Sequence, residues 1–269
     1  PALVLLAVVG LLSLERAVAC KPVWRRAVRW GWSLLLGFSV AFNLLASVKQ
    51  SAEWHSDLGA VLARQGKAQE AINHFEQALR LKPDYAEAHN NLGTALFQAG
   101  QVQEAIDHYE QALRLAPDFV DAHLNLGLAL MGQGKAQEAI DHYEQALRLK
   151  PDYAEAHNKL GTALMEQGRM QEAIGHFEQA VRIQPDYVKA QCNWGNALLR
   201  LGKVQEAIGH YEQAVRTQPD YANAHYNLGV ALETLGHTPE AIQHYEQALR
   251  IKPDFVQAQN ALARARAVP

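Results

Sequence analysis

Histidine is the side chain of this 269-residue chain that offers the most chemistry, because twelve imidazoles are present and imidazole both titrates near neutral pH and binds metals. Eleven of the twelve recur at two positions of a 34-residue spacing: His55, His89, His123, His157 and His225, and His74, His108, His142, His176, His210 and His244. Equivalent positions of neighbouring packed helices lie about 8–10 Å apart, whereas zinc holds its nitrogen ligands at about 2 Å. We therefore predict packing and surface roles for these histidines and no metal site.

Catalytic motifs are absent from the sequence. It contains no glycine-rich phosphate loop, no nucleophile elbow, no HExxH pair and no CxxC pair. We predict no active site and no cofactor in these residues. Residues 51–269 carry a net negative charge, and the only basic stripe in the sequence is a short run near the N-terminus. Nucleic acid is therefore not expected as a partner, because phosphate binding needs a basic stripe.

An internal repeat explains the histidine spacing. Six prolines lie 34 residues apart, and each is followed by Asp and an aromatic residue: Pro83, Pro117, Pro151, Pro185, Pro219 and Pro253. Exact repetition of this length is typical of stacked repeat architectures. Counting position 1 at residue 52, the six repeats are 52–85, 86–119, 120–153, 154–187, 188–221 and 222–255.

Each repeat is expected to form two helices. Positions 7 and 11 make an apolar i, i+4 stripe on the first helix, with glycine at position 8 where a second helix must approach closely. A glycine at position 15 ends the first helix, and proline at position 32 ends the second. The Asp after each proline is expected to cap the next first helix. In repeat 6, Thr238 is expected to cap the second helix.

These repeats resemble the tetratricopeptide repeat (TPR) family. The matching features are the Leu-Gly pair at positions 7 and 8, alanine at positions 20 and 27, the aromatic residue at position 24 and proline at position 32. Runs such as AEAHNNLG at 86–93 are similar to the superhelical TPRs of O-linked N-acetylglucosamine transferases. The resemblance implies an all-α, right-handed superhelix: an α-solenoid of six helix-turn-helix repeats in 51–255. Residues 256–269 are expected to form a capping helix.

The resemblance also implies a concave groove formed by positions 2, 5, 6, 9, 12 and 13 of the first helices. Position 6 is Asn in four repeats, and an amide row can pair with the backbone of an extended peptide. The competing interpretation, a compact polar residue on a curved surface, is left open. The peptide-binding candidates are Asn91, Asn125, Asn193, Asn227, Asn90, Asn158, Lys159, Lys189 and Tyr226.

Residues 1–50 are expected to be a membrane segment. Residues 30–48 carry no charge over 19 positions and would span roughly 28 Å as a helix, which suits a transmembrane helix. Residues 1–14 are an apolar part-helix that would complete a hairpin, and the loop 15–29 between them is basic. The positive-inside rule then predicts an integral membrane protein with its repeats outside the cytoplasm, in a periplasm or lumen.

Three functional hypotheses follow. The first is a membrane-tethered, non-enzymatic scaffold that binds a protein or extended peptide segment in the groove. The second is the substrate-docking C-terminal region of a multipass membrane glycosyltransferase, with catalytic residues before Pro1. The third is self-association through the near-identical repeats.

Overall fold

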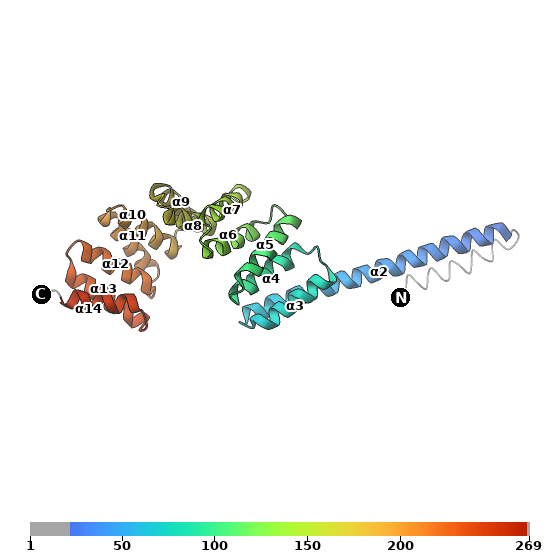
Figure 1. Cartoon of the computed structure of the whole chain (residues 1–269), viewed down its shortest axis with the longest axis horizontal. Coiled ribbons are helices and arrows are strands. Elements are labelled where there is room, and N and C mark those ends of the chain that lie inside the picture. The colour runs from blue at the N-terminus through green and yellow to red at the C-terminus, as the bar shows by residue number, and fades with distance from the viewer. Residues whose placement is uncertain (1–21, 268–269) are drawn as a thin grey trace. The chain divides into compact units, whose positions relative to one another are not determined.

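The computed structural model describes residues 22–267. Residues 1–21 and 268–269 lie outside the described part, and with them the predicted apolar helix 1–14 and the first half of the predicted basic loop. The described chain folds into thirteen helices and contains no strand (Figure 1). The helices are α2 (Pro22–Arg64), α3 (Ala68–Leu81), α4 (Ala86–Gln98), α5 (Val102–Leu115), α6 (Val120–Gly132), α7 (Ala136–Leu149), α8 (Ala154–Glu166), α9 (Met170–Ile183), α10 (Val188–Arg200), α11 (Val204–Thr217), α12 (Ala222–Thr234), α13 (Thr238–Ile251) and α14 (Val256–Ala267).

The chain divides into two compact units, with the boundary between Ala95 and Leu96. In the N-terminal unit, α2 packs against α3. In the C-terminal unit, the second helices α7, α9, α11 and α13 each pack against the first helix of their own repeat and against the next first helix, and α5 packs against α6. This pairing, carried from α5 to α14, confirms the predicted all-helical solenoid.

Helix α2 is longer than expected. Residues 22–29, assigned above to the basic loop, are helical, and the helix continues without a break into the first helix of repeat 1. The segment between Val48 and Ala52 contains no glycine or proline to stop it, and Lys49 pairs with Glu53 at 3.8 Å, one helical turn away. Among the described residues, none of the helices combines the length and the apolar character needed to cross a membrane. The transmembrane helix predicted at residues 30–48 is therefore not shown by the structure.

Glycine at position 15 closes each first helix as predicted. All six of these glycines have positive φ, between 74° and 81°, where a Cβ would be strained. After α6, the N–H of Lys135 reaches back over Gly134 to the carbonyl of Leu130 at 3.0 Å. This bond satisfies a helix-end carbonyl that would otherwise lack a partner.

Glycine at position 8 is also required by packing. A Cβ built on Gly161 would lie 2.6 Å from Cε1 of Phe177, and one built on Gly127 would lie 2.5 Å from Cε1 of Tyr143. The aromatic ring at position 24 therefore rests on the bare backbone of the first helix, and both rings are almost fully buried. The predicted close approach of the two helices is confirmed, and this contact is the centre of each hairpin's core.

The predicted side-chain caps are wrong. The residue that caps α8 is Tyr153, one place beyond Asp152, and its side chain makes no capping hydrogen bond. At α13 the cap is His237 rather than Thr238, again without a side-chain bond, although Pro239 occupies the first turn as expected. Pro and Asp form the turn itself, so the Asp lies one residue before the N-cap position.

The first helices of the C-terminal unit form its inner layer. Each contacts the next first helix, in the order α6, α8, α10, α12 and α14, whereas the second helices α7, α9, α11 and α13 contact only first helices. Neighbouring repeats therefore approach most closely on the first-helix side. We call the side of α6, α8, α10 and α12 that carries positions 2, 5, 6, 9, 12 and 13 the inner face.

Helix α14 packs against α12 and α13 of the sixth repeat. Its small side chains Ala258, Ala261 and Ala265 are buried against the last repeat. The Arg264 guanidinium donates two hydrogen bonds to the carboxylate of Glu233 on α12, at 3.2 and 3.0 Å. Ala263 takes the place of the position-8 glycine and is exposed to solvent. An alanine is tolerated there for that reason.

Candidate functional site

Position 6 supplies the central residues of the inner face: Asn125, Lys159, Asn193 and Asn227, all half-buried. They lie one helical turn or less from positions 2, 5 and 9, on the side of each first helix away from the position-8 glycine. Asn91 holds the same position on α4 in the N-terminal unit, where its Oδ1 accepts a 3.4 Å hydrogen bond from Asn90. The sequence therefore identified a set of side chains that share a face within each helix.

The amides of this row differ in what they can still bind. Asn193 donates from Nδ2 to Oδ1 of Asn158 at 2.9 Å and to Oγ1 of Thr162 at 3.4 Å. Both amide hydrogens are thus used in joining α10 to α8, and Oδ1 remains as an acceptor. Asn227 makes no side-chain hydrogen bond within the described residues, so its amide can both donate and accept.

Position 5 is a packing position rather than an open one. Asn90 and Asn158 are only 6% and 8% exposed, and Leu124 and Cys192 at the same position are equally buried. Asn158 also donates to the Tyr187 hydroxyl at 3.5 Å. Its amide therefore fixes one repeat to the next, and it presents little surface to a ligand. Burial raises the pKa of the Cys192 thiol to about 12.

The remaining candidates lie on the inner face with different surroundings. Lys159 pairs with Glu155 at 3.3 Å, one turn earlier on α8. Lys189, at position 2 of α10, is exposed. Tyr226 packs its ring against Tyr245 and Phe255, at 6.0 and 5.1 Å between ring centres, so that it also holds α13 and the start of α14 in place.

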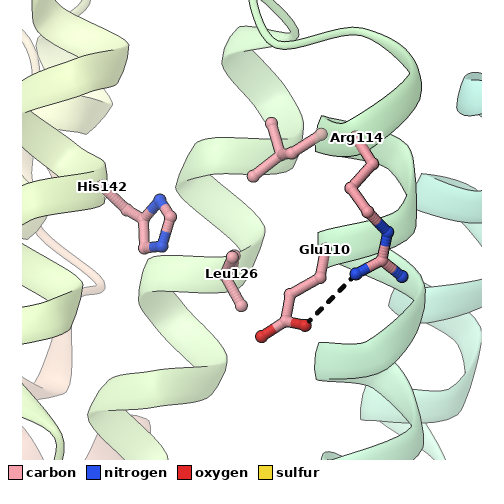
Figure 2. A pocket seen from close by; sticks show the side chains of 5 residues that line it. Glu110, Arg114, Leu126 and His142 are labelled. Carbon is pink, nitrogen blue, oxygen red and sulfur yellow. Dashed lines mark ion pairs between the residues drawn. The ribbon is translucent and has the colours of Figure 1, made fainter.

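Hollows also lie at successive repeat junctions, where the second helix of one repeat meets the next hairpin. One hollow of about 360 Å³ lies between α5, α6 and α7, where Glu110, Arg114, Leu126 and His142 line it (Figure 2). Glu110 and Arg114 face each other there as an ion pair at 3.9 Å. The residues 34 positions later line a second hollow of about 380 Å³ between α7, α8 and α9. Both are open to solvent rather than enclosed.

The histidines form pairs that the sequence reasoning missed. His123 and His142 meet at 3.0 Å between their Nδ1 atoms, and His157 meets His176 at 3.1 Å. The two members are 19 residues apart and come from the two helices of one repeat. Within the described part of the chain, no group of three or more His, Cys, Asp or Glu side chains could hold a metal ion. The constant separation of 19 residues was the sequence signal that could have revealed the pairs.

Two sequence models of the tetratricopeptide repeat match the chain, one over residues 124–188 and 192–255 and the other over residues 50–118. No sequence among curated proteins matches it.

Solved structures with the same fold are numerous. YrrB, described as a TPR protein with an unusual peptide-binding site, is 24% identical with a TM-score of 0.54, over 70% of this chain and 96% of that one. The pilF protein of Pseudomonas aeruginosa is 18% identical with a TM-score of 0.70, over 81% and 99% of the two chains. MamA is 25% identical with a TM-score of 0.56, over 64% and 94%. Family models and fold agree with the 34-residue pattern, and the chain belongs to the tetratricopeptide repeat family.

Proposed function

We propose that this chain is an interaction scaffold that holds an extended segment of another protein against the inner face. The observation that supports the proposal is the direct contact between the successive first helices α6, α8, α10 and α12, each of which carries position 6 at the same place in its sequence. In this proposal the repeats take part in binding rather than in catalysis.

The amides suit a peptide backbone because a backbone offers alternating N–H donors and carbonyl acceptors. Asn227 can satisfy one of each, and Asn193 can accept from an N–H through Oδ1. Neighbouring helices are spaced about 8–10 Å apart, and an extended chain advances about 3.3 Å per residue. A bound segment would therefore present about three residues to each repeat.

The inner face also offers charge for selectivity. Asp121, Glu155 and Lys189 occupy position 2 of three successive first helices, and all three are exposed. A segment lying along these helices would meet two acidic side chains and then a basic one. Asn90, Asn158 and Tyr226 contribute mainly by fixing the repeats, because they are buried or packed against aromatic rings.

A matched pair of variants tests the proposal. Peptides are first selected from a displayed library of random dodecamers on the immobilised chain. Asn227→Ala removes an amide that has no partner within the described residues, and Gln205→Ala removes an exposed amide from α11 on the opposite side. One backbone hydrogen bond is worth about 0.5–1.5 kcal/mol, so Asn227→Ala should weaken binding roughly 2- to 12-fold. Gln205→Ala should leave binding unchanged.

Two results would contradict the proposal. One is a selection that yields no binding peptide. The other is an equal effect of Asn227→Ala and Gln205→Ala on the measured dissociation constants. The combined replacement of Asn91, Asn125, Asn193 and Asn227 by alanine extends the test, and circular dichroism should show that the variant keeps its helicity.

Attachment of the scaffold to a membrane is a second proposal, favoured by α2. Apolar side chains on this helix before the first repeat are 63–72% exposed: Phe38, Val40, Phe42, Leu44 and Leu45. Exposed apolar patches of this kind mark partner or membrane contacts. Flotation with phosphatidylcholine vesicles tests it: the full chain should float, and a Phe38→Asp, Phe42→Asp, Leu45→Asp variant should not. Equal recovery of both at the bottom of the gradient would end the proposal. Placement of the repeats outside the cytoplasm remains a prediction.

A further inference from the structure

Histidine pairs recur through the described repeats with nearly constant geometry. The Nδ1 atoms of positions 4 and 23 are 2.9–3.1 Å apart in the pairs His55–His74, His123–His142, His157–His176 and His225–His244. In the last three pairs, Nε2 of the position-4 histidine lies 3.0 Å from the carbonyl oxygen of the proline at position 32 of the preceding repeat. Each arrangement joins the preceding turn, the first helix and the second helix, and we call it a histidine relay.

The relay fixes which nitrogen carries each hydrogen. The proline carbonyl can only accept, so Nε2 of the position-4 histidine must donate. In a neutral imidazole the other nitrogen is then an acceptor, so Nδ1 of position 4 accepts. Nδ1 of position 23 must therefore donate, and its Nε2 is left with a lone pair.

Repeat 5 and α14 support this assignment without the second histidine. In repeat 5, Gln191 stands at position 4 and its Oε1 lies 2.9 Å from Nδ1 of His210. An amide oxygen only accepts, so the position-23 histidine again donates. In α14, Gln259 occupies the equivalent of position 4 and donates from Nε2 to the carbonyl of Pro253 at 2.8 Å. Gln191 thus makes the bond to position 23, and Gln259 makes the bond to the proline carbonyl.

We propose that the histidine relays are proton-operated latches that hold the two helices of a repeat together at neutral pH and release them in mild acid. The first proton to reach a pair adds to the lone pair on Nε2 of position 23 and leaves every hydrogen bond intact. A second proton can add only to Nδ1 of position 4. The two Nδ1–H groups would then face each other, and the bond between the two helices would be lost. The latch therefore opens at the second proton.

Surrounding groups favour the neutral relay. Burial lowers the pKa of His123, with a smaller contribution from Arg148 of α7, and the bond to Pro117 opposes both. Burial and the charge of His123 lower the pKa of His142, against Asp141 and Glu138 on the same helix. From α5, Glu110 and Arg114 face His142 across the hollow, and they are paired with each other (Figure 2).

The relay of His157 and His176 is surrounded by the same kinds of groups as that of His123 and His142. Burial is the largest cause that lowers the pKa of His157, where Arg182 acts in the same direction while the bond to Pro151 and the charge of Asp152 oppose it. Burial and the charge of His157 lower the pKa of His176, where Glu172 opposes and Arg169 assists. Glu144 and Arg148 of α7 face this pair across the second hollow. The position-23 histidine of repeat 6, His244, has its pKa lowered by burial and by His225.

The sign of the pH effect follows from these directions. A histidine whose pKa is lower in the folded state stabilises that state above its ordinary pKa of about 6.5. The stability is lost as pH falls below that value, because the unfolded chain then binds more protons. For each imidazole that the fold keeps neutral, the unfolding equilibrium constant should rise by up to tenfold for each unit by which the pH falls below that value. Three position-4 histidines of the C-terminal unit belong to complete relays: His123, His157 and His225.

The test replaces the position-4 histidine with glutamine, the residue that repeat 5 and α14 already have at this position. The triple variant His123→Gln, His157→Gln, His225→Gln keeps an acceptor for the Nδ1–H of position 23, as Gln191 does, but removes the second proton site. Urea unfolding of the full chain is measured between pH 7.5 and 5.0. The unfolding constant of the unmodified chain should rise more steeply below pH 6.5 than that of the variant, by up to a hundredfold per pH unit for the two sites His123 and His157, whose pKa values the fold lowers. His237→Gln is the control, because His237 is exposed and stands outside both relay positions.

NMR of the unmodified chain tests the assigned histidine tautomers directly, and it does not depend on how well the variant folds. Long-range ¹H–¹⁵N spectra of the histidine rings at pH 7.5 report which nitrogen is protonated. Position-4 rings should carry hydrogen on Nε2 and position-23 rings on Nδ1. The proposal is overturned if position-4 rings carry hydrogen on Nδ1, or if the triple variant and the unmodified chain show the same pH dependence.

Discussion

The contact between the position-8 glycine and the aromatic ring allows a sharp test of how the hairpins are held together. Gly161→Ala places a methyl group where the Cε1 and Cδ1 atoms of Phe177 lie only 2.6 and 2.9 Å away. The ring is fully buried, so it cannot move aside without displacing its neighbours. We expect the variant to be less stable even though alanine is the better helix former.

The magnitude can be compared with a matched glycine. Alanine for glycine in a helix interior stabilises by about 1 kcal/mol when nothing opposes it. Gly175, in the interior of α9, has no atom within 4 Å of its added Cβ and is exposed, so Gly175→Ala should show that gain. Overpacking at Gly161 costs about 1–3 kcal/mol. The free energies of unfolding of the two variants should therefore differ by about 1–3 kcal/mol.

Urea denaturation followed by circular dichroism measures both variants. A double-mutant cycle adds Phe177→Leu, which removes the ring atoms that meet the new methyl group. The interaction energy of the cycle should be favourable by about 0.5 kcal/mol or more, because the smaller side chain relieves the overlap. If Gly161→Ala stabilises the protein as much as Gly175→Ala does, the proposed reason for glycine at position 8 is wrong.

Two further predictions concern the C-terminal unit. Arg264→Ala removes the ion pair with Glu233, whose side chain is 23% exposed, and should cost about 0.5–1 kcal/mol; amide exchange should become faster in α14, and unchanged exchange there would show that the pair does not dock this helix. In a Cys20→Ser background, the Cys192 thiol should resist Ellman's reagent at pH 8 until urea unfolds the chain, because burial raises its pKa to about 12; rapid labelling of the native protein would contradict its burial.

Most of the fold could be predicted because the 34-residue pattern specifies local structure repeatedly. Position-15 glycines such as Gly134 and Gly168 end the first helices at the expected place. Both have a positive φ, which is why the position requires glycine. The apolar residues Ala71, Ile72 and Phe75 lie on one face of α3, and that face is buried. These features depend on a helix and its immediate partner, which periodicity can report.

The errors arose where neighbouring segments decide the outcome. The loop predicted before residue 30 is in part the beginning of α2, because charge alone does not stop a helix and no glycine or proline intervenes between Pro22 and residue 30. Asp152 fails to cap α8 because the turn, and not the residue type, sets where the helix begins. Local sequence preference is a weak guide in both cases.

The inner face could be predicted only in part. Spacing places positions 5 and 6 on the same side of a helix, but it does not show that the next repeat covers position 5. Asn158 is buried by its bonds to Tyr187 and Asn193, which come from later in the chain. The histidine relays were missed for a related reason. Alignment of the repeats pairs each histidine with its equivalent in the next repeat. The observed histidine–histidine contact instead joins positions 4 and 23 of one repeat.

Site-specific photo-crosslinking tests the proposed role of the inner face most directly. p-Benzoylphenylalanine is introduced in place of Leu128, which is 38% exposed on α6, and separately in place of Gln171, which is exposed on α9. Each variant is irradiated with the tightest-binding peptide from the dodecamer selection, and the products are identified by mass spectrometry. The peptide should crosslink from residue 128 and not from residue 171. Crosslinking from residue 171 alone would show that the first helices do not form the binding surface.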